Sequence, residues 1–129
     1  MFRSGLLALA LLLAPAVAGA QNYRAPFSDA DYGYFYPTAY FDEGGVDWAC
    51  GNIFYSGHTG SDFGGGSWAG MDAGRDIVAA ANGGVTARHD GEFDRCSTAN
   101  CAPGNGNYVK IQHPNGRTTI YLHMKTWSV

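Results

Sequence analysis

The sequence predicts an all-β fold that is mainly antiparallel and rich in loops. A short β-prone run occupies residues 85–89, two more flank Asn115-Gly116, and turn-forming Asn, Asp, Gly and Pro residues separate them. The chain holds 19 glycines among 129 residues, and no heptad, internal repeat or P-loop pattern is present. This length suits one small domain.

Residues 1–20 have the parts of a secretory signal peptide. Arg3 supplies a positive charge, Leu6–Leu13 is apolar, and Ala18–Ala20 offers small residues for cleavage near Ala20. The alternative, an uncleaved membrane anchor, is disfavoured because the apolar run is too short to span a bilayer. We therefore expect a secreted, periplasmic or cell-envelope protein without stable membrane insertion.

Residues 21–45 form an aromatic-rich segment without helical periodicity, and we expect an extended lead-in to a domain spanning residues 46–129. Its run YGYFYPTAYF is interrupted by Pro37. Packing is the favoured role of these aromatic side chains, and a stacking surface for sugar or peptide is the alternative.

The middle of the chain combines a glycine-rich stretch with a predicted strand. Residues 57–74 are expected to be loop, because so many glycines disfavour both helix and strand. A short apolar run at 76–81 follows, then a turn at Asn82–Gly84 and a strand over Val85–His89.

The clearest local signal is a hairpin near the C-terminus, where two β-prone runs flank Asn115-Gly116. A two-residue turn there places Ile111 opposite Ile120 and makes their face apolar. His113 falls on this core face and is expected to be structural. The opposite, polar face would carry Lys110, Gln112, Thr119, Tyr121 and His123.

Charge and cysteine content limit the partners and the cross-links. The formal net charge is −3, and the absence of basic clusters argues against a nucleic-acid partner. Cys96 and Cys101 bracket four residues and can close a small loop, which leaves Cys50 without a predicted partner. The oligomeric state is not predicted.

The stretch GHTGSDFGGG contains the main candidate for a metal site. His58 and Asp62 are ligand types that suit zinc, but four extended residues span roughly 13 Å, too far for one ion. A bend at Gly60 would bring the two side chains together. The alternative is that both are solvated surface groups of a polar loop.

Three motifs in this order resemble the lysostaphin-type (LytM-like) zinc metallopeptidases. They are GHTGSDFG, which contains His-x-Gly-x-Asp, then GRDIVAAANGGVTARHDGEF, then GNGNYVKIQHPNGRTTIYLHM. The resemblance covers residues 57–124 and implies the β-sheet core of that family. It also implies a zinc endopeptidase that cleaves peptide cross-bridges of peptidoglycan or other exported peptides.

The same resemblance assigns roles to individual residues. His58 and Asp62 match the first two zinc ligands of the family. His123 matches the catalytic histidine that binds or polarises the substrate carbonyl. His113 matches a position that is not a ligand, and His89 matches none.

The sequence departs from the family because it has no His-x-His pair, which supplies the third zinc ligand and a histidine that helps to activate water. Three explanations stay open: a C-terminally truncated domain, which we favour, a degenerate member that binds cell wall or regulates another hydrolase, or a ligand from another chain. We therefore expect weak zinc binding and little or no peptidase activity, and a non-catalytic binding module is the alternative function.

Overall fold

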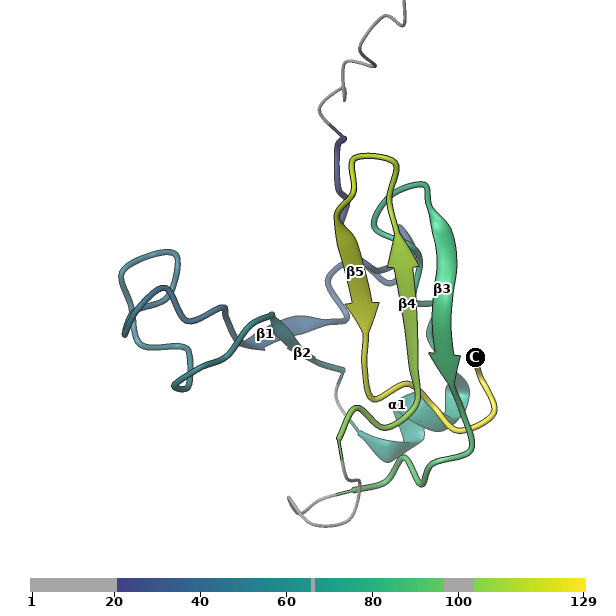
Figure 1. The fold of residues 1–129 in the computed structure, drawn as a ribbon. Helices are drawn as coiled ribbons and strands as arrows, with labels where there is room; N and C mark the ends of the chain where they lie inside the picture. The colour runs from purple at the N-terminus through teal and green to yellow at the C-terminus, as the bar shows by residue number, and fades with distance from the viewer. Residues whose placement is uncertain (1–20, 66, 97–103) are drawn as a thin grey trace, which may run out of the picture.

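The computed structural model describes residues 21–65, 67–96 and 104–129, so the predicted signal peptide and Cys101 lie outside the described residues. Its elements are β1 (Tyr36–Ala39), β2 (Asp62–Gly64), α1 (Trp68–Ala73), β3 (Gly84–His89), β4 (Tyr108–Gln112) and β5 (Thr118–Tyr121). All strand pairs are antiparallel, which confirms the predicted fold class (Figure 1). Within the described ranges, no helix is long and apolar enough to cross a membrane.

β3, β4 and β5 form a three-stranded sheet in that order. The predicted strand 85–89 and the hairpin at 108–121 are both present, but the predicted hairpin register is wrong by one residue. Ile111 lies opposite Thr119, not opposite Ile120, and Val109 lies opposite Tyr121. A shift of one residue moves side chains to the other face of a strand, so Tyr121 is on the face of Ile111.

The loop of the hairpin explains this shift. The amide of Gly116 donates to the carbonyl of His113 at 2.9 Å, and the amide of His113 donates to the carbonyl of Arg117 at 2.8 Å. Pro114 and Asn115 thus occupy the centre of a four-residue turn, and Gly116 follows with φ of 80°. This is a three-residue loop ending in a left-handed glycine, one residue longer than the predicted turn.

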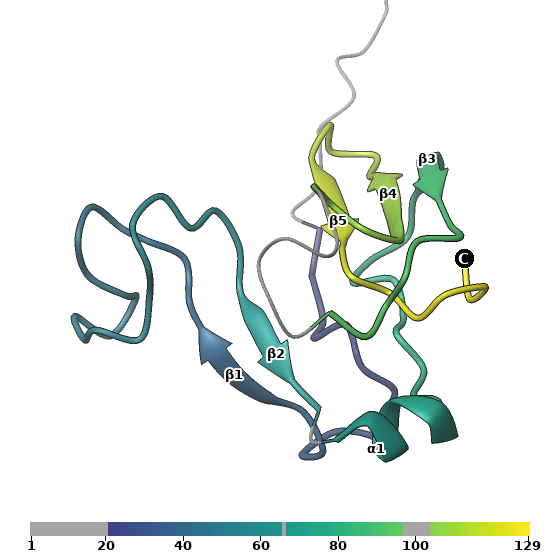
Figure 2. The ribbon, with the colours of Figure 1, turned by 90° about the horizontal axis from the view of Figure 1, so that it is seen from below.

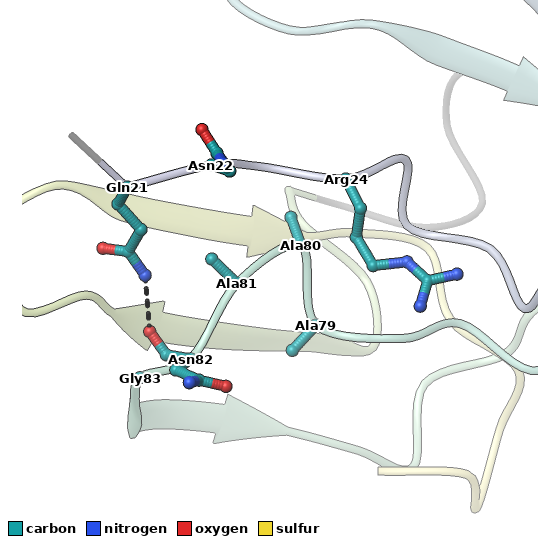
Figure 3. A pocket seen from close by; sticks show the side chains of 8 residues that line it. All are labelled: Gln21, Asn22, Arg24, Ala79, Ala80, Ala81, Asn82 and Gly83. Atoms are coloured by element: carbon teal, nitrogen blue, oxygen red, sulfur yellow. Dashed lines mark hydrogen bonds between the residues drawn. The ribbon is translucent and has the colours of Figure 1, made fainter.

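Two segments cover one face of the three-stranded sheet, the face that carries Ile111 and Tyr121, which we call the inner face. The amide of Arg24 donates to the carbonyl of Ala80 at 2.8 Å, so residues 21–24 run alongside 79–82 (Figure 3). The amide of Ala80 also donates to the Tyr121 hydroxyl at 2.7 Å. Ile111 and His113 are buried beneath these segments, with exposed fractions of 8% and 2%. This agrees with the structural role predicted for His113.

β1 and β2 form a separate two-stranded sheet, which lies to one side of the three-stranded sheet in both views (Figures 1 and 2). The expectation that residues 57–74 are loop throughout is therefore wrong, since they contain β2 and α1. β2 gains its hydrogen bonds from β1, which is distant in sequence. α1 begins after Ser67, whose hydroxyl accepts a hydrogen bond from the Gly70 amide and caps the first turn.

The aromatic residues before β1 are partly packed. Phe27 is buried, stacks on Phe35 with ring centroids 4.5 Å apart, and meets the edge of Phe63 at 4.8 Å. This cluster joins the lead-in to β2, so packing is the role of these rings. Tyr32, in contrast, is 78% exposed.

The cysteines differ in their bonding. Cys96 is disulfide-bonded, and its predicted partner Cys101 lies outside the described residues. Cys50 is exposed and free.

Candidate metal centre

The loop that leads into β2 brings His58 and Asp62 together. The chain bends at Gly60, and Nε2 of His58 lies 3.1 Å from Oδ1 of Asp62. The prediction that a bend at Gly60 would close the distance is confirmed. His58 is only 9% exposed, whereas the side chain of Asp62 is half exposed, so the pair opens to solvent on the aspartate side.

A backbone carbonyl fixes the orientation of the His58 ring. Nδ1 lies 2.7 Å from the carbonyl oxygen of Tyr40, which can only accept a hydrogen bond. Nδ1 must therefore carry a proton. In the neutral ring, Nε2 then presents its lone pair to Asp62. Zinc-binding histidines are commonly oriented by this kind of backbone hydrogen bond.

This arrangement places two hydrogen-bond acceptors against each other. A neutral imidazole Nε2 and a carboxylate oxygen at 3.1 Å repel unless a positive charge joins them. The charge is either a proton on Nε2 or a metal ion between the two atoms. Tetrahedral zinc with bonds of 2.0–2.2 Å separates its nitrogen and oxygen ligands by about 3.4 Å. The chemistry and spacing of this pair therefore fit zinc with a shift of a few tenths of an ångström.

Two aspartates hold the loop before His58 in shape. Asp42 accepts hydrogen bonds from the amides of Gly45, Gly57 and Gly44 at 2.7–3.0 Å. These bonds, that from Gly45 foremost, lower the pKa of Asp42 below its ordinary value. Asp47, only 3% exposed, accepts from the amides of Ala49, Gly51 and Ile53. Its pKa is also lowered, with Gly51 the largest cause.

Tyr55 completes the surroundings of the pair. Its ring stacks on the His58 imidazole with centroids 4.2 Å apart and planes 22° apart. Its hydroxyl donates to Oδ2 of Asp62 at 3.3 Å. Neither Tyr55 nor the Tyr40 carbonyl was predicted from the sequence, because neither lies within the His-x-Gly-x-Asp motif.

His123 follows β5 in a left-handed backbone conformation with φ of 54°. Its amide donates to the carbonyl of Asn105 at 3.3 Å, and the Met124 amide donates to the Asn107 carbonyl at 2.9 Å. A Cβ at Gly106 would lie 3.1 Å from Nδ1 of His123, so glycine leaves room for the ring there. His123 is exposed, but it lies beyond the end of β5, so its exposure does not come from the predicted hairpin register. Tyr121, predicted on the same polar face, is directed to the opposite face, where its hydroxyl accepts from the Ala80 amide.

No third ligand joins this pair in the part of the chain that the structure describes. Among the described residues, no group of three His, Cys, Asp or Glu side chains is placed to hold a metal ion. His113 is committed to Asn82 and Thr119 through both ring nitrogens, at 2.9 Å each. His89 contacts Glu92 at 2.8 Å at the surface. The candidate pair of His58 and Asp62 therefore has no third ligand beside it among the described residues.

A pocket lies between the N-terminal segment and residues 79–83, away from this pair (Figure 3). Its charged lining residue, Arg24, is bonded to the Phe27 carbonyl and to Asp29. None of the predicted site residues lines the pocket, so it is not the predicted site. Its lining residues are Gln21, Asn22, Arg24, Ala79, Ala80, Ala81, Asn82 and Gly83.

The His58–Asp62 pair lies in the part of the chain that matches a known protein family. The model described as Peptidase family M23 matches residues 56–129, more than half of the chain, including both residues of the pair and His123. No curated protein and no solved structure matches the chain.

Proposed function

The chain belongs to peptidase family M23, and we propose that it is a secreted zinc metalloendopeptidase-like domain that acts on peptide cross-bridges of peptidoglycan. The observation that carries the proposal is the His58–Asp62 pair. Its two facing acceptor atoms lie 3.1 Å apart and require a cation between them unless the imidazole is protonated. The domain is a peptidase-like module by its family, and the substrate and the export are parts of the proposal.

In this proposal, Nε2 of His58 and Oδ1 of Asp62 hold the zinc ion. The Tyr40 carbonyl keeps the ring in the tautomer that leaves Nε2 free to bind. A bound zinc ion supplies Lewis-acid chemistry, polarising a peptide carbonyl and making water a stronger nucleophile at neutral pH. Two protein ligands hold such an ion less tightly than the three that catalytic zinc sites usually have. We expect weak zinc binding by these 129 residues.

His123 is proposed to bind the substrate carbonyl by donating a hydrogen bond from its ring. Three features support this role. The side chain is exposed, its backbone is fixed by the Asn105 and Asn107 carbonyls, and Gly106 leaves space beside the ring. A histidine with a fixed backbone can donate to a developing oxyanion at small reorganisation cost.

Export is proposed from the composition of residues 1–20, with cleavage near Ala20. Peptidoglycan lies outside the cytoplasmic membrane, so a substrate of this class requires an exported enzyme. The proposed substrate and the proposed location are therefore consistent with each other.

A second function is favoured by a specific observation: among the described residues, no third candidate metal ligand lies beside His58 and Asp62. A domain with this incomplete set would bind cell wall or regulate another hydrolase without cleaving peptides. The exposed aromatic rings of Trp48 and Tyr55 in the same loop offer contact area for such binding.

Zinc titration and peptidoglycan digestion of the purified protein test both functions. We expect the unmutated protein to bind zinc weakly and His58→Ala to abolish this binding. The matched control is His89→Ala, an exposed histidine outside the pair, which should bind zinc as the unmutated protein does. Equal zinc binding by the His58→Ala variant and the unmutated protein would sink the proposed metal site.

Digestion separates the two functions. Zinc-dependent release of peptides that is lost in His123→Ala supports the peptidase. Sedimentation of the protein with peptidoglycan, without release of peptides at any zinc concentration, supports the binding module instead.

A further inference from the structure

Tyr55 contacts both members of the His58–Asp62 pair. Its ring lies nearly parallel to the imidazole, with centroids 4.2 Å apart, and its hydroxyl lies 3.3 Å from Oδ2 of Asp62. The Tyr55 ring thus covers one face of the buried His58 imidazole. Over half of the tyrosine surface is still exposed, so the contacts come from its placement and not from burial in a core.

The two oxygens of Asp62 have separate partners. Oδ1 faces Nε2 of His58 at 3.1 Å, and Oδ2 accepts the hydrogen bond from Tyr55. A carboxylate without such a partner rotates readily about its terminal torsion, which has broad and roughly two-fold preferences. The two oxygens are chemically equivalent, so the phenolic hydrogen bond fixes the plane of the carboxylate, with one oxygen toward Tyr55 and the other toward His58.

A tight turn fixes Tyr55 in this position. The His58 amide donates to the Tyr55 carbonyl at 3.0 Å, and Gly57 between them has φ of 76°. The Gly57 amide is in turn held by Asp42 at 2.8 Å. Tyr55 and His58 are the first and last residues of this turn, which brings their rings close enough to stack.

We propose that Tyr55 is a positioning residue of the metal site, which holds Asp62 by its hydroxyl and His58 by its ring so that Oδ1 and Nε2 point at one cation. This inference rests on the proposed zinc site. The phenol acts through the two ligands and does not touch the metal itself.

The geometry of Tyr55 is that of a hydrogen-bond donor to a ligand and not that of a ligand. Its hydroxyl oxygen lies against Oδ2 of Asp62, whereas the atom that faces Nε2 of His58 is Oδ1.

The test replaces the hydroxyl and keeps the ring. Tyr55→Phe and the unmutated protein are titrated with Zn²⁺ against a chromophoric chelator, and Co²⁺ binding is followed by its visible absorption. Because partners of metal ligands affect affinity by ten- to hundredfold, we expect Tyr55→Phe to bind zinc about tenfold more weakly. The cobalt spectrum should change in shape, since Asp62 is free to rotate.

Two controls separate positioning from folding. Tyr32→Phe removes a hydroxyl from a tyrosine that is 78% exposed, and its zinc affinity should be unchanged. The urea midpoint of the metal-free Tyr55→Phe protein should equal that of the unmutated protein. Tyr55→Leu, which also removes the ring contact, should weaken zinc binding further than Tyr55→Phe.

The outcomes distinguish this inference from the proposed function. Zinc binding that depends on His58 but is equal in Tyr55→Phe and the unmutated protein overturns the role of Tyr55 and leaves the metal site intact. Weakened binding accompanied by an equal loss of folding stability also overturns it, because Tyr55 would then be only structural. Binding that does not depend on His58 overturns the metal site, and the role of Tyr55 with it.

Discussion

Asn107 ties three segments of the chain together, and replacing it with alanine should destabilise the protein strongly. Its side chain is 1% exposed. Oδ1 accepts from the Glu92 amide at 2.8 Å, and Nδ2 donates to the carbonyls of Glu92 and Met124 at 3.0 Å each. The Met124 amide donates back to the Asn107 carbonyl, so the residue after His123 is held from both sides.

The expected loss of stability is worked out from the groups that lose a hydrogen-bond partner. In Asn107→Ala, the Glu92 amide and the Met124 carbonyl lose these side-chain bonds, while the Glu92 carbonyl keeps the Thr126 hydroxyl. A buried group without a partner costs about 1–3 kcal/mol, and Glu92 and Met124 are only half-buried, so we expect a loss of about 2 kcal/mol in the free energy of unfolding. Asn107→Asp should cost at least as much, because a carboxylate cannot donate to two carbonyl oxygens.

Urea unfolding followed by tryptophan fluorescence measures this loss. The control is Asn52→Ala, an exposed asparagine, which should stay within about 0.5 kcal/mol of the unmutated protein. If Asn107→Ala were as stable as this control, the reasoning from buried hydrogen bonds would be refuted.

Two further predictions concern the loop that carries His58. Gly57→Ala should destabilise the loop by about 1–3 kcal/mol, because φ of 76° strains a residue with a Cβ. Hydrogen exchange of the His58 amide should therefore become faster, and an unchanged exchange rate would contradict this prediction. The pKa values of Asp42 and Asp47 are lowered in the folded state, so their ionised carboxylates stabilise it. This contribution to folding stability is fully present above the ordinary pKa of about 3.9 and is lost as the pH falls through the lower folded values. The loop amide signals should therefore stay native in NMR spectra down to about pH 4 and change only below it; a change centred near pH 6 would contradict this.

The fold class was predictable because its signals are local. Alternating β-prone residues around Pro114-Asn115-Gly116 are sufficient to predict a hairpin, and the structure contains it. The register was not predictable from the same letters, because a two-residue and a three-residue loop both accommodate Asn-Gly. The choice between them depends on which face is covered, and residues 21–24 and 79–82, distant in sequence, provide that cover.

The helix α1 and strand β2 were missed for a related reason. Glycine disfavours regular structure in isolation, and the glycine-rich composition of residues 57–74 therefore predicted loop throughout. β2 nevertheless forms because β1 supplies its backbone hydrogen bonds, and α1 forms behind the Ser67 cap. The first of these partners is more than 20 residues away and leaves no local trace.

The sequence by itself determined the all-β class and the family, and it showed that a bend at Gly60 could bring His58 and Asp62 together, because residue type and turn-forming glycines are local properties. Only the tertiary structure decided which atoms meet. The Tyr40 carbonyl selects the nitrogen of His58 that faces Asp62, and the Tyr55 hydroxyl fixes the plane of the Asp62 carboxylate beside it. Both choices depend on contacts made when the loop closes on itself, and neither is written in the spacing of the motif.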